Sequence, residues 1–165
     1  MTTRVSNQHR ARCRAAVRAQ RGVGLIEVLV AVLLLSIAFL GVAALQATSL
    51  STNNSAMARS MATVASYSVL DAMRADRTVA MAGGYNTSGA IKASACPAEG
   101  STLASVQLHD WCNTLGATLG AVESTTGQIA CQGAEGDCTI TIQFDDSRAG
   151  TGGANNQSVV TRGML

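Results

Sequence analysis

An unbroken apolar segment dominates the N-terminal third of the chain. Residues 28–45 are 18 residues without a charge, almost all of them apolar, and residues 23–26 extend the segment with Glu27 as its one charge. A helix of about 20 apolar residues spans the hydrocarbon core of a bilayer. A secretory signal peptide has a shorter apolar core, about 7–15 residues, and a small-residue cleavage site after it. The length of this segment and the lack of a clear site at its end favour a membrane-spanning helix.

Helical spacing continues beyond the apolar segment. No proline or clear helix stop occurs between residues 23 and 80, and apolar residues recur at steps of three and four through residues 57–73. This pattern predicts a single helix over residues 23–79, with its second half carrying a soluble domain on one face. We expect that face to be packing surface rather than a ligand or metal site. It consists of Met57, Met61, Val64, Tyr67, Leu70 and Met73.

Shorter elements are expected in the C-terminal half. The glycine-rich residues 82–89 end the long helix, and apolar residues at helical spacing predict a second helix over residues 102–119. Alternating apolar and polar residues at 138–144 predict a half-buried strand, paired with residues 128–131 across a turn, and residues 158–161 form a short closing strand. The expected fold class is therefore α+β, with a long N-terminal helix packed against a small antiparallel sheet and one short helix.

Charge is distributed unevenly along the chain. Residues 1–22 contain six arginines and no acid, whereas the rest of the chain has six basic and ten acidic residues, although the formal net charge is only +2. Basic residues next to a membrane segment stay in the cytoplasm, so we expect the N-terminus there. The acidic body would repel phosphates. We therefore expect no nucleic-acid partner.

Four cysteines follow the apolar segment: Cys96, Cys112, Cys131 and Cys138. A domain of about 85 residues with few aromatic side chains has a thin core, and disulfides stabilise such domains in oxidising compartments. Four cysteines allow three pairings. Because Cys131 and Cys138 flank the expected turn, we favour 131–138 together with 96–112. A zinc site is the alternative, but these cysteines lack the closely spaced pairs typical of zinc ligands.

No group of residues in the sequence indicates catalysis. His109 and Cys112 stand three residues apart on the expected helix, where the cysteine could be a nucleophile and the histidine its base. Cys112 falls on the apolar face, however, which favours a structural cysteine and a surface histidine. Asp145 and Asp146 follow a strand and could contact a cation, although adjacent acids before a loop are more often solvated. We therefore predict no enzyme, no catalytic residue, no metal and no cofactor.

Glu27 is the residue that suggests a specific function, because an acid in an apolar helix costs a few kcal/mol unless it has a partner. Residues 21–31 (RGVGLIEVLVA) resemble the prepilin signature of type IV pilins and type II secretion pseudopilins. The resemblance implies that a prepilin peptidase cuts between Gly22 and Val23, removing Cys13 with the leader, and that the new N-terminus at Val23 is methylated. Glu27 is then the fifth residue of the mature chain and pairs with the N-terminal amine of a neighbouring subunit.

The resemblance narrows to the PilV-type minor pilins, also described as type IV pilus modification proteins. The similar segments are residues 22–31, 35–37, 40–42, 45–46, 58–62, 70–76, 110–111 and 139–146. This family implies a pilin-like fold and a low-abundance subunit that initiates pilus assembly near the tip, in twitching motility and adhesion. The implied partners are prepilin peptidase, other minor pilins, the major pilin, a pilus tip adhesin and the inner membrane.

The resemblance also implies a division of the chain. Residues 1–22 are a cleaved leader, 23–47 the membrane and filament-core helix, 48–80 its continuation, and 81–165 a small disulfide-bonded periplasmic domain. The chain crosses the inner membrane once, with its N-terminus in the cytoplasm, before it enters the pilus at the cell surface. Two alternatives stay open: a minor pseudopilin of a type II secretion system, and a periplasmic binding domain on an uncleaved anchor.

Overall fold

The computed structural model describes residues 22–132, 136–149 and 153–165, so the expected leader lies outside the described residues except for Gly22. The chain divides into two units, Met1–Gly41 and Val42–Leu165, and helix α1, Leu25–Ala75, contributes to both. The second unit adds helices α2 (Arg77–Met81) and α3 (Leu103–Leu119) and strands β1 (Ile91–Lys92), β2 (Thr126–Gln132), β3 (Asp137–Phe144) and β4 (Gln157–Met164). The predicted α+β class is confirmed, with a long N-terminal helix and a small antiparallel sheet.

Helix α1 ends earlier than its sequence pattern suggests. The pattern predicted one helix over residues 23–79, but α1 stops at Ala75 and α2 follows after Asp76. Asp76 has φ −117° and ψ 49°, which is outside the helical region. Aspartate favours such breaks because its short carboxylate competes with the helical backbone for hydrogen bonds. Here the carboxylate also accepts a hydrogen bond from the Tyr85 hydroxyl at 3.3 Å.

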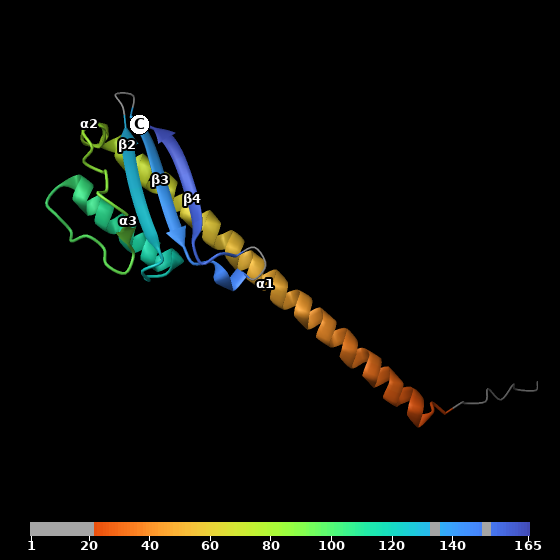
Figure 1. The fold of residues 1–165 in the computed structure, drawn as a ribbon. Helices are drawn as coiled ribbons and strands as arrows, with labels where there is room; N and C mark the ends of the chain where they lie inside the picture. The colour runs from red at the N-terminus through yellow and green to blue at the C-terminus, as the bar shows by residue number, and fades with distance from the viewer. Residues whose placement is uncertain (1–21, 133–135, 150–152) are drawn as a thin grey trace, which may run out of the picture. The chain divides into compact units, whose positions relative to one another are not determined.

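The sheet has four antiparallel strands in the order β1-β2-β3-β4 (Figure 1). The predicted hairpin is present, because β2 and β3 pair with Cys131 opposite Cys138 and Ile129 opposite Ile140. The closing strand is present as β4 and is longer than predicted. β1 was not predicted, because two residues are too few to show an alternating pattern.

Helices α1 and α3 pack against one face of this sheet, behind the strands in Figure 1. On the packed face β3 buries four side chains, those of Cys138, Ile140, Ile142 and Phe144. The residues between them, Thr139, Thr141 and Gln143, are half-buried or exposed on the opposite face. The strand is therefore half-buried, as its alternation predicted.

The buried face of α1 is not the predicted one. Leu70 and Met73 are buried as expected, but Met57 is 60%, Val64 61% and Tyr67 54% exposed. The residues that α1 buries are mostly small: Ser55, Ala62, Ala65, Ser66, Val69, Leu70 and Met73. Small side chains let the helix backbone approach its neighbours closely, but they contribute little to an apolar periodicity. The prediction therefore followed the larger residues to the exposed side of the helix.

Helix α3 is fixed to both α1 and the sheet. Thr102 begins the helix with a capping box, in which its hydroxyl accepts a hydrogen bond from the Ser105 amide at 3.2 Å. The buried Trp111 donates its indole N–H to the main-chain oxygen of Ala65 on α1 at 3.0 Å. Gly127 on β2 makes room for the indole, because a Cβ there would lie 2.5 Å from the ring. Trp111 is thus held where the sheet and both helices meet.

Tyr85 closes the core at the loop after α2. Its side chain is fully buried, and its hydroxyl contacts two acceptors, Asp76 Oδ2 and Gln107 Oε1. Burial raises the pKa of Tyr85 from 10.0 to about 12, and the negative charge of Asp76 and its hydrogen bond add to the shift. The native state therefore holds the proton of this hydroxyl more tightly than the unfolded chain does.

Replacing Leu70 by alanine tests the packing of α1 on the sheet. Leu70 is fully buried, so Leu70→Ala should lower the free energy of unfolding by about 2–5 kcal/mol. Leu50 lies on the same helix but is 65% exposed, and Leu50→Ala should change it by less than about 0.5 kcal/mol. Urea unfolding of the detergent-solubilised chain, followed by fluorescence of the single tryptophan, measures both. Equal effects of the two variants would contradict this assignment of the buried face.

The raised pKa of Tyr85 predicts a loss of stability at alkaline pH. Between about pH 10 and about pH 12 the unfolded chain releases the Tyr85 proton while the folded chain retains it, so the free energy of unfolding should fall as pH rises through this range. Urea unfolding at several pH values should show a smaller fall for Tyr85→Phe than for the wild type. Tyr67→Phe, at an exposed tyrosine of α1, is the control. Parallel pH profiles for Tyr85→Phe and the wild type would refute the prediction.

Candidate functional site

The start of α1 brings the residues of the prepilin-like signature together. Gly22 and Val23 precede the helix, and the main-chain oxygen of Gly24 accepts hydrogen bonds from the amides of Glu27 at 2.9 Å and Val28 at 3.3 Å. Glu27 lies in the first turn, where the partial positive charge of the helix N-terminus favours a carboxylate. Gly22 is exposed, and a Cβ there would meet no atom within 4 Å. The peptide bond after Gly22 is therefore accessible.

Glu27 is surrounded by apolar side chains of its own helix. Together with Glu27, five residues line one shallow concave surface: Val23, Val28, Ala31, Val32 and Leu35. Ala31 stands four residues after Glu27, so both share one face of α1, and Val23, just before the helix, lines the same surface. Within residues 22–132, 136–149 and 153–165, no cation forms an ion pair with Glu27. The carboxylate is thus an exposed charge on an apolar surface, with no ion-pair partner in the described part of the chain.

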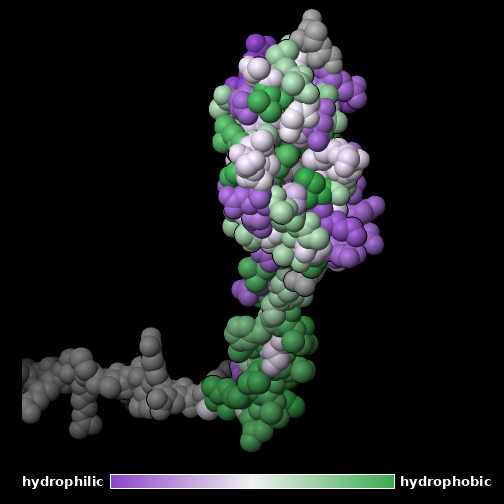
Figure 2. All heavy atoms as spheres, turned by 90° about the vertical axis from the view of Figure 1, so that its left-hand side faces the viewer, coloured by the Kyte–Doolittle hydropathy of each residue, from purple (hydrophilic) through white to green (hydrophobic). Residues whose placement is uncertain are grey.

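The first unit leaves all of its described side chains uncovered. Large apolar residues from Val23 to Leu40 are between 49% and 79% exposed, and Figure 2 shows this part of α1 as a nearly continuous hydrophobic surface. The hydroxyl of Ser36, a polar group within it, donates to the main-chain oxygen of Val32 at 2.7 Å. By length and composition α1 can cross a membrane. Lipid or other apolar helices are the surroundings that fit this surface.

All four cysteines after the apolar segment are in disulfides. Cys96 bonds to Cys112 and Cys131 to Cys138, which are the two pairings that the sequence analysis favoured. The first bond fastens the loop before α3 to that helix, and the second joins β2 to β3 beside their turn. Sulfur atoms bonded to each other offer no thiolate, so these cysteines do not form the alternative zinc site.

His109 and Cys112 do not form a nucleophile and its base. The sulfur of Cys112 is bonded to Cys96, and both ring nitrogens of His109 have structural partners. Nδ1 lies 2.7 Å from the main-chain oxygen of Pro97, and Nε2 lies 2.9 Å from Asn113 Nδ2. The contact with Pro97 holds the loop before α3 against that helix, and the contact with Asn113 lies within α3. The histidine thus has a structural role in the geometry observed.

Asp146 corrects the expectation that both acids after β3 are solvated. Its side chain is only 7% exposed. Its carboxylate accepts a hydrogen bond from the Ser55 hydroxyl at 2.5 Å, and it lies 3.6 Å from Arg59 Nη2, both on α1. These contacts fasten the β3–β4 loop to α1 and compensate the buried charge. Ser55 and Asp146 are 91 positions apart in the sequence. Local sequence patterns therefore could not predict this cluster.

Comparison with known proteins supports only the N-terminal part of this interpretation. Residues 17–43 match the family model described as the prokaryotic N-terminal methylation motif. No match was found among curated proteins or among solved structures. The matched residues include Gly22, Val23 and Glu27, and the motif indicates a type IV pilin-like protein or pseudopilin that is processed by prepilin peptidase and assembles with other pilins.

Proposed function

We propose that this chain is a minor pilin of the type IV pilus, of the PilV type, that is processed between Gly22 and Val23 and helps to initiate pilus assembly near the tip. One observation carries the proposal. Glu27, five positions after Gly22, lies in the first turn of a helix whose apolar side chains are exposed in the first unit. The methylation motif matches this segment. Cleavage would create a positively charged, methylated amine at Val23, four residues before the carboxylate.

The proposed role of Glu27 follows from the cost of leaving charges unpaired in an apolar environment. An uncompensated acid in a membrane costs a few kcal/mol, and so does an uncompensated amine. When helices of several subunits pack together, the carboxylate of one can pair with the Val23 amine of the next, which removes both penalties. Such pairing fixes the axial position of one helix against another. Assembly, rather than a chemical reaction, is the activity we propose.

The apolar helix suits both places in which the protein would reside. In the inner membrane its uncovered side chains contact lipid, and in the pilus they contact the helices of other pilins. Because lipid tails and apolar helices are similar in polarity, transfer between them needs no change in α1. We place the membrane and filament-core part at residues 23–47, its continuation at 48–80, interrupted at Asp76, and the periplasmic domain at 81–165. Two disulfides fit an oxidising periplasm.

The C-terminal domain would then decide which partners the subunit meets. We propose that it contacts other minor pilins, the major pilin and a tip adhesin, in support of twitching motility and adhesion. Mass spectrometry of the N-terminus of protein taken from membranes is the first test. A chain that starts at N-methylated Val23 would support the proposal, whereas an intact leader in cells with active prepilin peptidase would refute it. Recovery in sheared surface fibres would separate a pilin from a secretion pseudopilin.

Changing Gly22 should prevent removal of the leader. Gly22→Leu places a branched side chain before the bond that the peptidase cuts, so we expect the full-length chain to accumulate in the membrane. Gly24→Ala is the matched control, since a Cβ at Gly24 would only touch Ile26, at 4.0 Å, and this variant should be processed normally. Gel mobility and the mass of the N-terminal peptide report the outcome. A shortened Gly22→Leu product would show that cleavage occurs at another bond, and would contradict the assignment.

Changing Glu27 should impair assembly without impairing processing. Glu27→Val should still be cleaved and remain in the membrane, but its amount in sheared fibres should fall about tenfold or more, equivalent to roughly 1.4 kcal/mol of lost pairing. Ser36→Ala removes a polar group from the same apolar helix but leaves the carboxylate, and should assemble normally. Immunoblots of membrane and fibre fractions compare the variants. Wild-type amounts of Glu27→Val in fibres would count against the pairing.

A further inference from the structure

Strand β4 leaves one edge of the sheet open. It is the last strand in the order β1-β2-β3-β4. Cys131 and Cys138, directly opposite each other on β2 and β3, have Cα atoms 4.0 Å apart, which is the close spacing of a pair without mutual main-chain hydrogen bonds. Since the pattern alternates, β3 bonds to Val159, Thr161 and Gly163 of β4. The main-chain groups of Ser158, Val160 and Arg162 then point away from the sheet.

The opposite edge of the sheet, along β2, is closed. The side chain of Asn86 bonds both main-chain groups of Cys131, at 2.8 Å to its amide and 3.2 Å to its oxygen. Thr87 does the same for Ile129, through its hydroxyl to the amide at 3.1 Å and its own amide to the oxygen at 3.0 Å. The short strand β1 covers Gly127. Folded proteins commonly close their edges in this way because an open strand pairs readily with other chains.

Arginine side chains of α1 and α2 hydrogen-bond to both ends of the open edge. Arg59 Nη2 donates to Gln157 Oε1 at 3.3 Å at the start of β4. At the other end, Arg74 donates to the main-chain oxygen of Met164 and Arg77 to that of Leu165, each at 3.2 Å. Between these anchors, the described residues supply no hydrogen-bond partner for the outward main-chain groups of β4. An edge fixed in this way loses little conformational freedom on binding.

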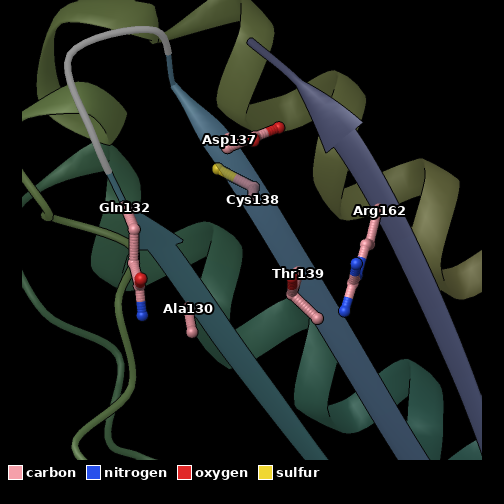
Figure 3. Close-up of a pocket in the computed structure, with 6 residues that line it drawn as sticks. All are labelled: Ala130, Gln132, Asp137, Cys138, Thr139 and Arg162. Carbon is pink, nitrogen blue, oxygen red and sulfur yellow. The ribbon is translucent and has the colours of Figure 1, made fainter.

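The side chains next to this edge indicate which sequence it would accept. Val160 is 56% exposed, and Arg162 is exposed with no ion-pair partner among the described residues. Figure 3 shows the guanidinium end of Arg162 directed toward Thr139 and away from the carboxylate of Asp137. Arg162 and Thr139 line a hollow of about 580 Å³ on the outer face of the sheet. Asp137 lines the same hollow but forms no ion pair with Arg162. A carboxylate brought next to Arg162 would therefore meet a cation that is not already paired.

We propose that β4 binds an extended segment of another protein, which adds to the sheet as a further strand. Main-chain hydrogen bonds to Ser158, Val160 and Arg162 would hold the segment, as in other cases of strand addition. Residues opposite one another on neighbouring strands share a face, so the segment carries an apolar residue opposite Val160 and an acidic residue opposite Arg162. A second copy of β4 is a poorer occupant, because residues 157–164 contain no acid. The proposal concerns the second unit alone and does not depend on the proposed function.

Amide hydrogen exchange of the full chain in detergent tests the proposal with a defined probe. The probe is a capped synthetic peptide of threonines, as long as β4, with one valine and one glutamate two positions apart; a second peptide has lysine in place of glutamate. The glutamate peptide should slow exchange at Ser158, Val160 and Arg162 about fivefold or more, and the lysine peptide should have little effect. Arg162→Glu should reverse this preference between the two peptides.

Val160→Pro removes one outward amide without breaking the ladder to β3, and it should abolish the slowing by the glutamate peptide. Val160→Thr keeps the amide and should bind as the wild type does; tryptophan fluorescence confirms that both variants fold. The proposal is overturned if neither peptide slows exchange at the edge, or if Arg162→Glu leaves the peptide preference unchanged. Protection that appears without peptide and grows with protein concentration would assign the edge to a second copy instead, and would also overturn it.

Discussion

The close approach of α1 to its neighbours is the constraint on which the folded unit depends. Ala62, Ala65 and Ser66 are buried on α1, and none has a side chain long enough to keep the helix backbone at a distance. This allows the indole of Trp111 to reach the main-chain oxygen of Ala65. Gly163 has the same effect on β4, where a Cβ would lie 3.1 Å from Leu70. The large residues of the core then fill the space between α1, α3 and the sheet. Their packing positions the sheet and α3 against α1.

Two carboxylates on or beside α1 illustrate how the chain treats charge. Asp146 is buried, and the hydroxyl of Ser55 and the guanidinium of Arg59 compensate its charge within the second unit. Glu27 lies on an apolar surface and has no cation among the described residues. A buried charge without a partner is costly, so the contacts of Asp146 compensate that cost within the fold, whereas the exposed carboxylate of Glu27 stays available for the pairing that we propose. The two sheet edges differ in the same way: the main-chain groups along β2 have hydrogen-bond partners within the described chain, whereas the outward groups of β4 do not.

Local sequence patterns were sufficient wherever a structural or functional feature depends on neighbouring residues. The apolar segment, the Gly22–Glu27 spacing, the helix of residues 102–119 and the hairpin of β2 and β3 all have a periodicity or a turn that lies within a few residues. The two disulfide pairings could be favoured for the same reason, since the turn between Cys131 and Cys138 is visible in the sequence. The apolar composition of residues 23–41 also predicts an apolar environment for the first unit, and every described side chain of that unit is exposed in the structure.

Only the tertiary structure decided which face of α1 is buried, because that choice depends on how closely the sheet and α3 can approach rather than on the apolar residues of α1 itself. The same holds for the buried Asp146, whose partners Ser55 and Arg59 are remote in sequence, and for Asn86 and Thr87, whose side chains substitute for a strand along β2. The sequence by itself determined the prepilin-like start and the longer elements, but not the break at Asp76 or the short strand β1. Long-range contacts determined which surfaces are closed and which are left for a partner, because burial and strand pairing are set by residues far apart in the chain.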